Sequence, residues 1–455
     1  MEIAAVILAA GKGTRMKSSL PKVLHKVGGK SMLLRVLNAA KIAGAKKQVI
    51  IIGHGAEKVR EEIGDAFEYA VQEPQLGTGH AVMQAKNALQ NFSGTVLILC
   101  GDTPLLDGNE LAKFILEHQK TQAAVSVLTT HFANPFGYGR IVRDENDNVK
   151  CIVEEKDANL EQKKITEINT GIYAMQCPEM FEILETLSNN NAQGEYYLTD
   201  VLEKFRMQGK KVAAVVTENS DMVMGINSRR QLAEAEAVLR QKILCNWMDE
   251  GVTIMDPAST FIEEDVEIGQ DTVIRPFVWL EGKTKIGKNC EIGPNVRFTN
   301  VKIGDETNLQ FIYAHDCQVG NKVTAGPFVH LRPDTEIGDK VKIGNFIEVK
   351  NSKVGEGSKL PHLSYIGDTD MGSGVNVGCG SIMVNYDGKK KHRTKIGNNV
   401  FIGCNSNLVA PVTLNDNSFI AAGSTITKDV PKDALAVARG KQKNIELWAK
   451  KYFEN

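Results

Sequence analysis

An aliphatic residue followed by glycine recurs through the second half of the chain, from Ile268-Gly269 to Ile402-Gly403. Several successive pairs are six residues apart, and Ile268 and Ile286 are separated by eighteen residues. A spacing of six does not match the period of a helix and is too regular for a β-sandwich. It is typical of a left-handed parallel β-helix, in which three hexapeptide strands form each triangular coil and one aliphatic side chain per hexapeptide points inward. The repeat therefore predicts such a β-helix over residues 251–437.

The first half has a different pattern, in which short apolar runs alternate with helical stretches. Strands are expected at 4–11, 47–55, 94–102 and 123–130, and helices at 31–44 and 109–119. This alternation predicts an α/β domain with a Rossmann-like, mostly parallel sheet, whose ligands bind at the carboxyl ends of the strands. The predicted organisation is a domain at 1–227, a linker helix at 228–250, the β-helix at 251–437 and a basic, amphipathic tail at 438–455.

The overall composition is that of an ordinary globular protein. Hydrophobic residues make up 42% of the chain, and the formal net charge is −1. A nearly neutral chain has no global field that would attract nucleic acid or a membrane surface, and no apolar run approaches the roughly 18 residues of a membrane helix. Eight cysteines without a Cys-x-x-Cys pair fit reduced side chains better than disulfides or a zinc site. We therefore expect a cytoplasmic protein that acts on small molecules, without nucleic acid or membrane insertion.

The loop after the first expected strand has the residue types of a phosphate site. Gly11 and Gly13 allow backbone N–H groups to approach an anion, and Arg15 and Lys22 supply positive charge. The loop is neither a P-loop nor a dinucleotide fingerprint, because the glycine and lysine spacing of both is missing. Asp102 follows another strand of the same sheet. A carboxylate there suits Mg²⁺ bound to nucleotide phosphates, although it could also cap the next segment.

These features belong to an ordered set of motifs that resembles the sugar-nucleotide pyrophosphorylases. The set comprises GKGTRM (11–16), PK (21–22), QLGTGHA (75–81), GDTPL (101–105), GYGRIV (137–142), EEKDA (154–158), EINTG (167–171) and NNNAQGEYYLTD (189–200). Together with the predicted β-helix, it makes the chain similar from end to end to the bacterial family of bifunctional N-acetylglucosamine-1-phosphate uridyltransferases and glucosamine-1-phosphate N-acetyltransferases.

For the first half, the resemblance implies transfer of UMP from UTP to N-acetylglucosamine-1-phosphate. It implies catalytic roles for Arg15 and Lys22, and Mg²⁺ binding by Asp102 and Asn227. The residues that it implies for UTP or the UDP-sugar are Leu8, Ala9, Ala10, Gly11, Gln72, Gly77, Thr78, Gly139, Glu154, Asn169, Thr199 and Asn227. The nucleophile would be the sugar's own phosphate, which is largely dianionic at neutral pH. The site then needs cations that position the two anions, and it does not need a general base.

In the second half, His362 is the candidate base of another site. The sequence places it in an irregular stretch near Glu348, Lys350 and Tyr365. A histidine among serines and glycines is commonly just an exposed or capping residue, but hexapeptide-repeat proteins are often acyltransferases. Acetylation of an amine requires the neutral amine, and an imidazole with a pKa of about 6.5 is suited to remove its proton near neutral pH.

For this half, the resemblance implies transfer of the acetyl group from acetyl-CoA to glucosamine-1-phosphate. It implies catalysis by His362, Glu348 and Asn385. The residues implied for the sugar phosphate are Arg332, Lys350, Tyr365, Asn376 and Lys391, and those for acetyl-CoA are Asn385, Tyr386, Cys404, Ala421, Ala422 and Arg439. The repeat is interrupted at 385–394, which predicts a loop on a functional face. In the family, the acetylation site is built between subunits, so the resemblance also implies a homotrimer.

Two alternatives stay open beside a bifunctional enzyme that makes UDP-N-acetylglucosamine for wall or surface polysaccharide. One is a nucleotidyltransferase with a single activity, whose β-helix is structural or regulatory. The other is a non-catalytic solenoid that binds a nucleotide as a signal. His362 and the interrupted coil favour the bifunctional enzyme over the first alternative, and the basic glycine loop with Asp102 argues against the second.

Overall fold

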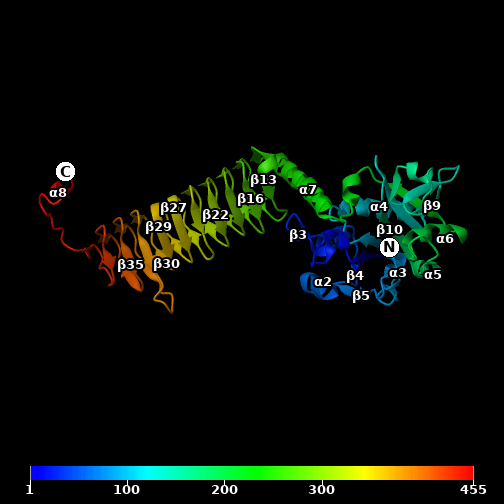
Figure 1. Cartoon of the computed structure of the whole chain (residues 1–455), viewed down its shortest axis with the longest axis horizontal. Helices are drawn as coiled ribbons and strands as arrows, with labels where there is room; N and C mark the ends of the chain where they lie inside the picture. Colours follow the sequence, from blue (N-terminus) through cyan, green and yellow to red (C-terminus); the bar gives the residue numbers. More distant parts are fainter. Residues whose placement is uncertain (1, 454–455) are drawn as a thin grey trace. The chain divides into compact units, whose positions relative to one another are not determined.

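The computed structural model describes residues 2–453, which divide into two compact units (Figure 1). The division lies between Leu239 and Arg240, inside helix α7 (Arg229–Asp249). We call residues 1–239 the N-terminal unit and residues 240–455 the C-terminal unit. The boundaries read from the sequence, which set residues 228–250 apart as a linker, stay predictions.

The N-terminal unit is built on a sheet whose strands follow the order β11-β7-β10-β6-β1-β4-β5. Strands β1 (Glu2–Leu8), β4 (Lys47–Ile52), β5 (Glu68–Val71) and β6 (Gly94–Cys100) are parallel to one another. Strand β10 (Glu167–Cys177) runs antiparallel between β6 and β7 (Val125–His131), and β11 (Val212–Val216) is parallel to β7. The α/β prediction is confirmed, and the inserted β10 makes the sheet mixed.

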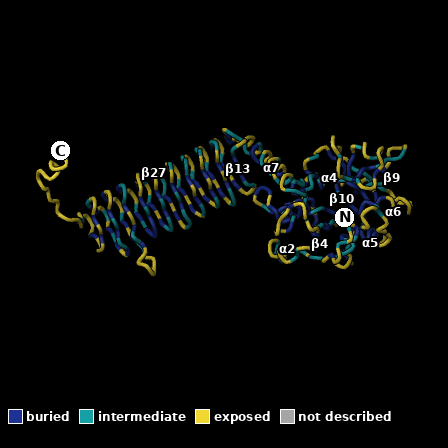
Figure 2. The backbone as a smooth tube through the Cα atoms, viewed as in Figure 1, coloured by how far each residue is buried: buried dark blue, intermediate teal, exposed yellow. Residues whose placement is uncertain are grey.

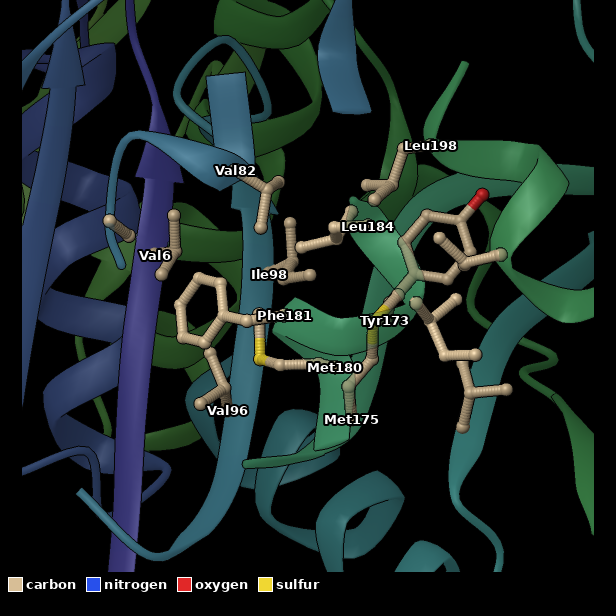
Figure 3. Close-up of a cluster of buried hydrophobic side chains, with 14 of the residues drawn as sticks. Val6, Val82, Val96, Ile98, Tyr173, Met175, Met180, Phe181, Leu184 and Leu198 are labelled. Carbon is tan, nitrogen blue, oxygen red and sulfur yellow. The ribbon is translucent and has the colours of Figure 1, made fainter. Parts of the chain in front are cut away.

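The remaining elements of this unit are short. The helices are α1 (Met32–Ile42), α2 (Ala56–Ile63), α3 (Thr78–Met83), α4 (Gly108–Thr121), α5 (Glu179–Leu184) and α6 (Val201–Met207). The other strands are β2 (Lys26–Val27), β3 (Lys30–Ser31), β8 (Arg140–Arg143) and β9 (Val149–Val153). Figure 3 shows part of the core, where Val6 of β1, Ile98 of β6, Tyr173 of β10 and Phe181 of α5 meet. This core fixes the strand ends on which the N-terminal site is built.

The C-terminal unit winds into stacked coils with three strand-lined faces. Face one contains β12 (Thr253–Ile254), β15 (Val273–Ile274), β18 (Glu291–Ile292), β21 (Asn308–Leu309), β24 (Thr324–Ala325), β31 (Asn376–Val377), β34 (Phe401–Ile402), β37 (Phe419–Ile420) and β39 (Leu435–Ala436). Face two contains β13 (Thr260–Ile262), β16 (Val278–Glu281), β19 (Val296–Thr299), β22 (Ile312–His315), β25 (Val329–Leu331), β32 (Ile382–Val384), β35 (Asn407–Val409) and β38 (Thr425–Ile426). Face three contains β14 (Glu267–Ile268), β17 (Lys285–Ile286), β20 (Lys302–Ile303), β23 (Gln318–Val319), β26 (Glu336–Ile337), β28 (Lys353–Val354), β30 (Thr369–Met371), β33 (Thr394–Ile396) and β36 (Val412–Leu414).

Two longer strands, β27 (Lys342–Lys350) and β29 (Lys359–Gly367), run from face one around the corner into face two. A short helix, α8 (Lys450–Phe453), follows the last coil. No helix among residues 2–453 is both long enough and apolar enough to cross a membrane.

The repeat seen in the sequence explains how the coils are filled and stacked. The aliphatic member of every pair from Ile268 to Ile402 is buried, and Figure 2 shows the resulting alternation of buried and exposed residues along the coils. The glycine that follows lies where adjacent coils approach closely, since a Cβ on Gly269 would stand 2.6 Å from the carbonyl carbon of Gly287. Aliphatic burial therefore fills the coil, and glycine allows one coil to stack on the next.

Candidate active sites

The N-terminal site forms where β1 and β6 end side by side. The N–H of Gly101, just after β6, donates to the carbonyl of Leu8 at the end of β1, at 2.9 Å. Ala9 is fixed to β4 through the carbonyl of Ile51 at 2.8 Å, and the carbonyl of Ala10 accepts the N–H of His54 at 3.3 Å. The glycine loop therefore starts from a rigid edge of the sheet.

Gly13 has a backbone conformation that the loop needs in order to hold Lys22. Its φ is +58°, and a Cβ there would stand 2.6 Å from the Cβ of Lys22. Glycine accepts this left-handed conformation without the penalty that a side chain would bring. A Cβ at Gly11 would meet no heavy atom within 4 Å, and Arg15 is exposed in the adjacent 3-10 turn, Thr14–Met16. The backbone around Gly11 and the Arg15 guanidinium are thus open to a ligand.

Lys22 lies between the two residues that the resemblance implies as metal ligands. Its Nζ forms a close ion pair with Oδ2 of Asp102 and donates to Oδ1 of Asn227 at 2.9 Å. Lys22 comes from the glycine loop, Asp102 from the end of β6 and Asn227 from the residues before α7. The exposed fractions of the Lys22 and Asp102 side chains are only 13% and 19%. The fold therefore gathers three distant segments around one shielded positive charge.

The same two oxygens suit a magnesium ion. A carboxylate and an amide oxygen that converge on one cationic atom are donors of the kind that Mg²⁺ accepts, with water and phosphate completing its shell. Among the residues that the structure describes, no group of three or more His, Cys, Asp or Glu side chains forms a separate metal centre. The residues present thus fit a metal that is held partly by the substrate.

Gln72, Gly77 and Thr78 form one wall of this site. Gln72 is buried, and its Nε2 donates to the carbonyl of Gly77 at 2.9 Å. The φ of Gly77 is +109°, and a Cβ there would stand 2.7 Å from the carbonyl oxygen of Tyr196. The hydroxyl of Thr78 accepts the N–H of Leu198 at 3.1 Å. The two predicted motifs at 75–81 and 189–200 are therefore docked on each other.

Four further predicted residues lie together beside β10. The N–H of Asn169 donates to the carbonyl of Gly139 at 2.8 Å, and a Cβ on Gly139 would stand 3.5 Å from Oε1 of Glu154. Burial raises the pKa of the Glu154 carboxyl, and the nearby carboxylates of Asp157 and Asp200 raise it further. Thr199 is buried in the 3-10 turn Leu198–Asp200. The structure thus brings the four residues implied for the sugar into one neighbourhood.

Cys100, at the end of β6, also belongs to this neighbourhood. Burial and the Asp102 carboxylate raise the pKa of its thiol to about 12, against a smaller opposite effect of Lys22. The thiol is therefore protonated and unreactive at neutral pH.

In the C-terminal unit, three predicted cationic residues gather at one edge of face two. Arg332 donates from Nη1 to Oε1 of Glu348 at 2.8 Å, and its N–H donates to the carbonyl of Val349 in the next coil at 2.9 Å. The ammonium of Lys391 lowers the pKa of Lys350, and partial burial and Arg332 lower it further, against an opposite effect of the Asp368 carboxylate. Like charges held this close disfavour each other unless an anion lies between them. We call Arg332, Lys350 and Lys391 the basic cluster.

Asp368 organises the polar groups beside the basic cluster, and sequence reasoning missed it. It is 5% exposed, and its carboxylate oxygens accept short hydrogen bonds from the side-chain amides of Asn351 and Asn385. The Asn385 amide also lies 3.3 Å from the hydroxyl of Tyr365, so two predicted residues are joined here. A lone aspartate in a repeat carries no signal in the sequence that separates this role from a turn residue.

The interruption at 385–394 is confirmed as a loop outside the wall. Strand β32 ends at Val384, and β33 resumes the coil at Thr394. Tyr386, which is exposed, pairs with Lys391 in an isolated antiparallel bridge across the loop. The loop therefore carries Lys391 out to the edge where Lys350 lies.

The expectation that His362 lies in an irregular stretch is wrong. His362 is in the middle of β29, paired with Asn345 of β27, and its Nδ1 lies 2.9 Å from Oδ1 of Asn345. It is exposed at the corner between faces one and two, whereas the β29 partner of Lys350 is Gly367, five residues further on. Asn376 lies on face one, in β31. Within a single chain, His362 and the basic cluster therefore lie at opposite edges of face two.

Four of the residues implied for acetyl-CoA follow the same corner as His362, whereas Asn385 and Tyr386 follow β32 at the edge where the basic cluster lies. Cys404 and Ala422 occupy equivalent turn positions in consecutive coils, since Phe401 and Phe419, three residues before each, are paired. Ala421 donates to the carbonyl of Ala436 at 2.9 Å, and Arg439 donates from Nη1 to the carbonyl of Ala422 at 2.9 Å. Small side chains along this corner leave the backbone accessible to an extended ligand.

Face two also carries an open groove of 1120 Å³ along its His362 edge. Seven of its lining residues are large apolar side chains with exposed fractions from 43% to 59%, namely Phe277, Trp279, Tyr313, Phe328, Phe346, Leu363 and Ile382. Phe328 and Phe346 stack with ring centroids 5.2 Å apart. An exposed apolar strip of this kind is typical of a protein–protein interface.

Comparison with known proteins agrees with both halves. Residues 4–254 match the nucleotidyl transferase family, and residues 393–428 match the bacterial transferase hexapeptide family, described as six repeats. The chain is 53% identical over 447 residues to the bifunctional protein GlmU of Caldanaerobacter subterraneus subsp. tengcongensis, covering 98% of this chain and 97% of that protein. This chain belongs to the GlmU family.

Other GlmU proteins are similarly close. The protein from Geobacillus sp. (strain WCH70) is 52% identical over 442 residues, covering 97% of this chain and 96% of its own. The protein from Listeria monocytogenes serotype 4a (strain HCC23) is 50% identical over 446 residues, covering 98% of both chains. The resemblance drawn from the sequence motifs is thus confirmed, as is the left-handed parallel β-helix of hexapeptide repeats.

Proposed function

We propose that this GlmU-family chain is a bifunctional enzyme. It acetylates glucosamine-1-phosphate with acetyl-CoA, and it then transfers UMP from UTP to N-acetylglucosamine-1-phosphate, releasing pyrophosphate and UDP-N-acetylglucosamine. The observation that carries the proposal is that one chain holds two separate anion-directed sites. Lys22 with Asp102 and Asn227 forms the first, and the basic cluster forms the second. A nucleotidyltransferase with a merely structural β-helix has no use for the second.

In the uridyl transfer, the N-terminal site positions two anions. Asp102 and Asn227 would hold Mg²⁺, which neutralises charge on the triphosphate when it is bound. Lys22 and Arg15 attract the phosphates, and Gln72 and the backbone near Gly77 read the uracil. Gly139, Glu154, Asn169 and Thr199 hold the sugar, whose phosphate attacks the α-phosphorus while pyrophosphate leaves. Stabilisation of charge on the leaving group by these fixed cations is the main catalytic effect.

In the acetyl transfer, the basic cluster holds the sugar phosphate, with Tyr365 and Asn376 as further contacts. His362 accepts the proton of the sugar's ammonium group, and the bond from its Nδ1 to Asn345 leaves Nε2 free to do so. The neutral amine attacks the thioester carbonyl, Asn385 stabilises the oxyanion, and Glu348 orients the cluster through Arg332. Coenzyme A leaves along the corner that carries Cys404, Ala421, Ala422 and Arg439, and Tyr386 of a second subunit lies beside its path.

This mechanism requires a homotrimer, in which His362 of one subunit faces the basic cluster of another. Two features support the assembly. His362 and Lys350 lie at opposite edges of face two in one chain, and an exposed aromatic strip follows the His362 edge. Burial of that strip between subunits would remove apolar surface from water and bring the two halves of the site together. The enzyme would act in the cytoplasm, where UTP and acetyl-CoA are found, and its product would supply wall or surface polysaccharide.

One coupled assay tests the proposal. The full-length protein is given glucosamine-1-phosphate, acetyl-CoA, UTP and Mg²⁺, and free coenzyme A, pyrophosphate and UDP-N-acetylglucosamine are measured. The His362→Ala variant should lose release of coenzyme A but still make the UDP-sugar from pre-acetylated substrate. His131→Ala, at an exposed histidine of the N-terminal unit, is the control. Acetylation that survives in His362→Ala removes His362 from its role, and a wild-type protein that releases no coenzyme A leaves only the single-activity alternative.

A further inference from the structure

The corner that carries His362 also carries two thiols in consecutive coils. Cys379 follows two residues after Val377 of β31, and Cys404 follows two residues after Ile402 of β34, and Val377 and Ile402 are directly paired. His362 precedes Cys379 by one coil, because Lys359 of β29 pairs with Asn376 of β31. The four corner positions His362, Cys379, Cys404 and Ala422 therefore form one column.

Backbone hydrogen bonds keep these turns in register. The N–H of Gly380 donates to the carbonyl of Leu363 at 2.8 Å, and the N–H of Asn405 donates to the carbonyl of Cys379 at 2.7 Å. The next bond of the series runs from the N–H of Gly423 to the carbonyl of Cys404 at 2.8 Å. The turns that hold the two cysteines are thus stacked as closely as the strands that precede them.

The spacing of these turns brings the two sulfurs within reach of each other. Stacked parallel strands lie about 4.8 Å apart, and disulfides join Cα atoms that are about 4.4 to 6.8 Å apart. The close stacking of the coils holds at this point too, since a Cβ on Gly378 would stand 2.5 Å from the backbone nitrogen of Cys404. Both cysteines are free thiols, with Cys404 exposed and Cys379 half-buried.

We propose that Cys379 and Cys404 form a redox-modification site that switches off acetyl transfer. This inference rests on the proposed function, which places the thioester and the pantetheine arm of acetyl-CoA along the same column. A disulfide between adjacent turns pulls the corner together beside His362 and removes the accessible backbone that the arm needs. The N-terminal unit shares no residue with this column, so uridyl transfer continues.

The oxidant is a low-molecular-weight disulfide, a class that includes the disulfide of coenzyme A itself. The exposed Cys404 thiolate attacks one sulfur of this disulfide, which forms a mixed disulfide and releases the first small thiolate. The Cys379 thiolate then attacks the Cys404 sulfur, which forms the bond between the coils and releases the second small thiolate. Two protein thiols are oxidised and one small disulfide is reduced to two thiols, which take up the two protons. A dithiol reductant reverses both steps.

The experiment treats the reduced, full-length protein with coenzyme A disulfide and, in a parallel arm, with glutathione disulfide. After gel filtration, acetyl transfer and uridyl transfer are each measured relative to the same protein before treatment. We expect a loss of acetyl transfer of about a hundredfold, since small displacements of a positioned substrate cost this much. Uridyl transfer should stay within twofold, dithiothreitol should restore acetyl transfer, and peptide mapping should find Cys379 joined to Cys404. Faster inactivation by coenzyme A disulfide is expected, because the remainder of that molecule binds along the same corner.

Variants identify the sulfurs that react. Cys404→Ser, compared with its own untreated activity, should keep acetyl transfer after treatment without any reductant. Cys379→Ala should stop at the mixed disulfide on Cys404, without a bond between the coils. Cys151→Ser, at a half-buried cysteine of the N-terminal unit, should be inactivated like the wild type.

Three outcomes overturn the proposal. The first is full acetyl transfer although Cys379 and Cys404 are shown to be joined. The second is a peptide map that pairs other cysteines. The third is inactivation of both single variants that dithiothreitol reverses as it does in the wild type. Failure of the proposed function is distinct, because it appears as absence of coenzyme A release in the fully reduced protein before any oxidant is added.

Discussion

The two units build their sites in opposite ways. In the N-terminal unit, Lys22, Asp102 and Asn227 come from three distant segments and touch one another inside one chain. In the C-terminal unit, His362 and Lys350 come from segments close in sequence and lie at opposite edges of one face. A parallel sheet gathers its loops at the carboxyl ends of its strands, whereas each coil of a solenoid contacts only its neighbours. The sheet can therefore complete a site alone, whereas under the proposed function the β-helix needs another copy to do so.

The sharpest way to break this comparison is the Lys22→Ala variant. Uridyl transfer should fall about a thousandfold, because a shielded cation that stabilises the leaving phosphates is lost. Acetyl transfer should be unchanged, since the partners of Lys22, namely Asp102 and Asn227, belong to the N-terminal unit. Separate assays for pyrophosphate and free coenzyme A check this, with Lys113→Ala on the surface of α4 as the control. Equal losses in both assays would mean that the two sites are not independent.

Acid should separate the stabilities of the two units. His118 is fully buried between Ser126 and Gln176, and burial lowers its pKa to about 4. Because the folded pKa lies below the unfolded value near 6.5, the unfolded chain takes up this proton first as the pH falls. The N-terminal unit is therefore fully stable above pH 6.5 and loses about 3 kcal/mol by about pH 4.

The tryptophans make that prediction measurable. Trp247, Trp279 and Trp448 are the three tryptophans of the chain, and all lie in the C-terminal unit, so their fluorescence follows that unit during urea unfolding. Far-ultraviolet circular dichroism at the helix band follows mainly the N-terminal unit. On acidification, the dichroism midpoint should move to lower urea by more than the fluorescence midpoint, and His118→Gln should reduce the difference. His131→Gln is the control, and parallel shifts of both signals would contradict the prediction.

Disruption of the aromatic strip tests the need for a second copy. Phe346→Asp places a charge in the proposed interface, where loss of a buried aromatic anchor costs about 2 kcal/mol or more. We expect weaker assembly in sedimentation velocity and acetyl transfer lowered about thirtyfold, with uridyl transfer intact. Leu116→Asp, at an equally exposed apolar residue of α4, should change neither. Acetyl transfer that survives in a monomeric Phe346→Asp protein would show that one chain completes the site.

The smallest effect is expected at Lys350. Lys350→Ala removes one charged contact to phosphate, so KM for glucosamine-1-phosphate should rise about tenfold with a smaller change in kcat. Lys353→Ala, on face three and paired with Glu336, is the matched control. In the wild type, the lowered pKa of Lys350 means that phosphate binding weakens at a lower pH than an ordinary lysine would allow. Lys391→Ala should move the alkaline limb of the pH profile for phosphate binding to higher pH. If this limb does not move, Lys391 does not lower the pKa of Lys350.

The comparison also explains what the sequence could reveal. Periodicity reports local geometry, so the pairs from Ile268 to Ile402 predict the β-helix, and the apolar runs predict the parallel strands. The antiparallel β10 could not be seen in that pattern, because a buried strand of either direction has the same composition. The sequence suggests an irregular stretch at His362 because serines and glycines surround this histidine, although the β-helix continues through them.

Contacts between coils were partly accessible from the sequence. Arg332 and Lys350 are eighteen residues apart, and the coil length alone places them together, as the structure shows. The same counting of eighteen from His362 leads to Gly380, whereas the coil there is seventeen residues long and places Cys379 above His362. Asp368 could not be found by counting, because its role depends on the burial of its carboxylate against Asn351 and Asn385, which no spacing encodes.

The loop between β32 and β33 shows how a chain of this fold can accept inserted residues. Asp370 pairs with Lys353 below it, seventeen residues back, and with Lys395 above it, twenty-five residues ahead, so the extra residues leave no trace in the stacking. Each rung is set by its own short strands, and insertions at a corner do not propagate. Residues 387–390, at the tip of the loop, can thus be lengthened, shortened or recoded while every other rung keeps its position. For protein engineers, the tip of this loop is therefore a position where one segment can be exchanged for another without moving the coils of the β-helix.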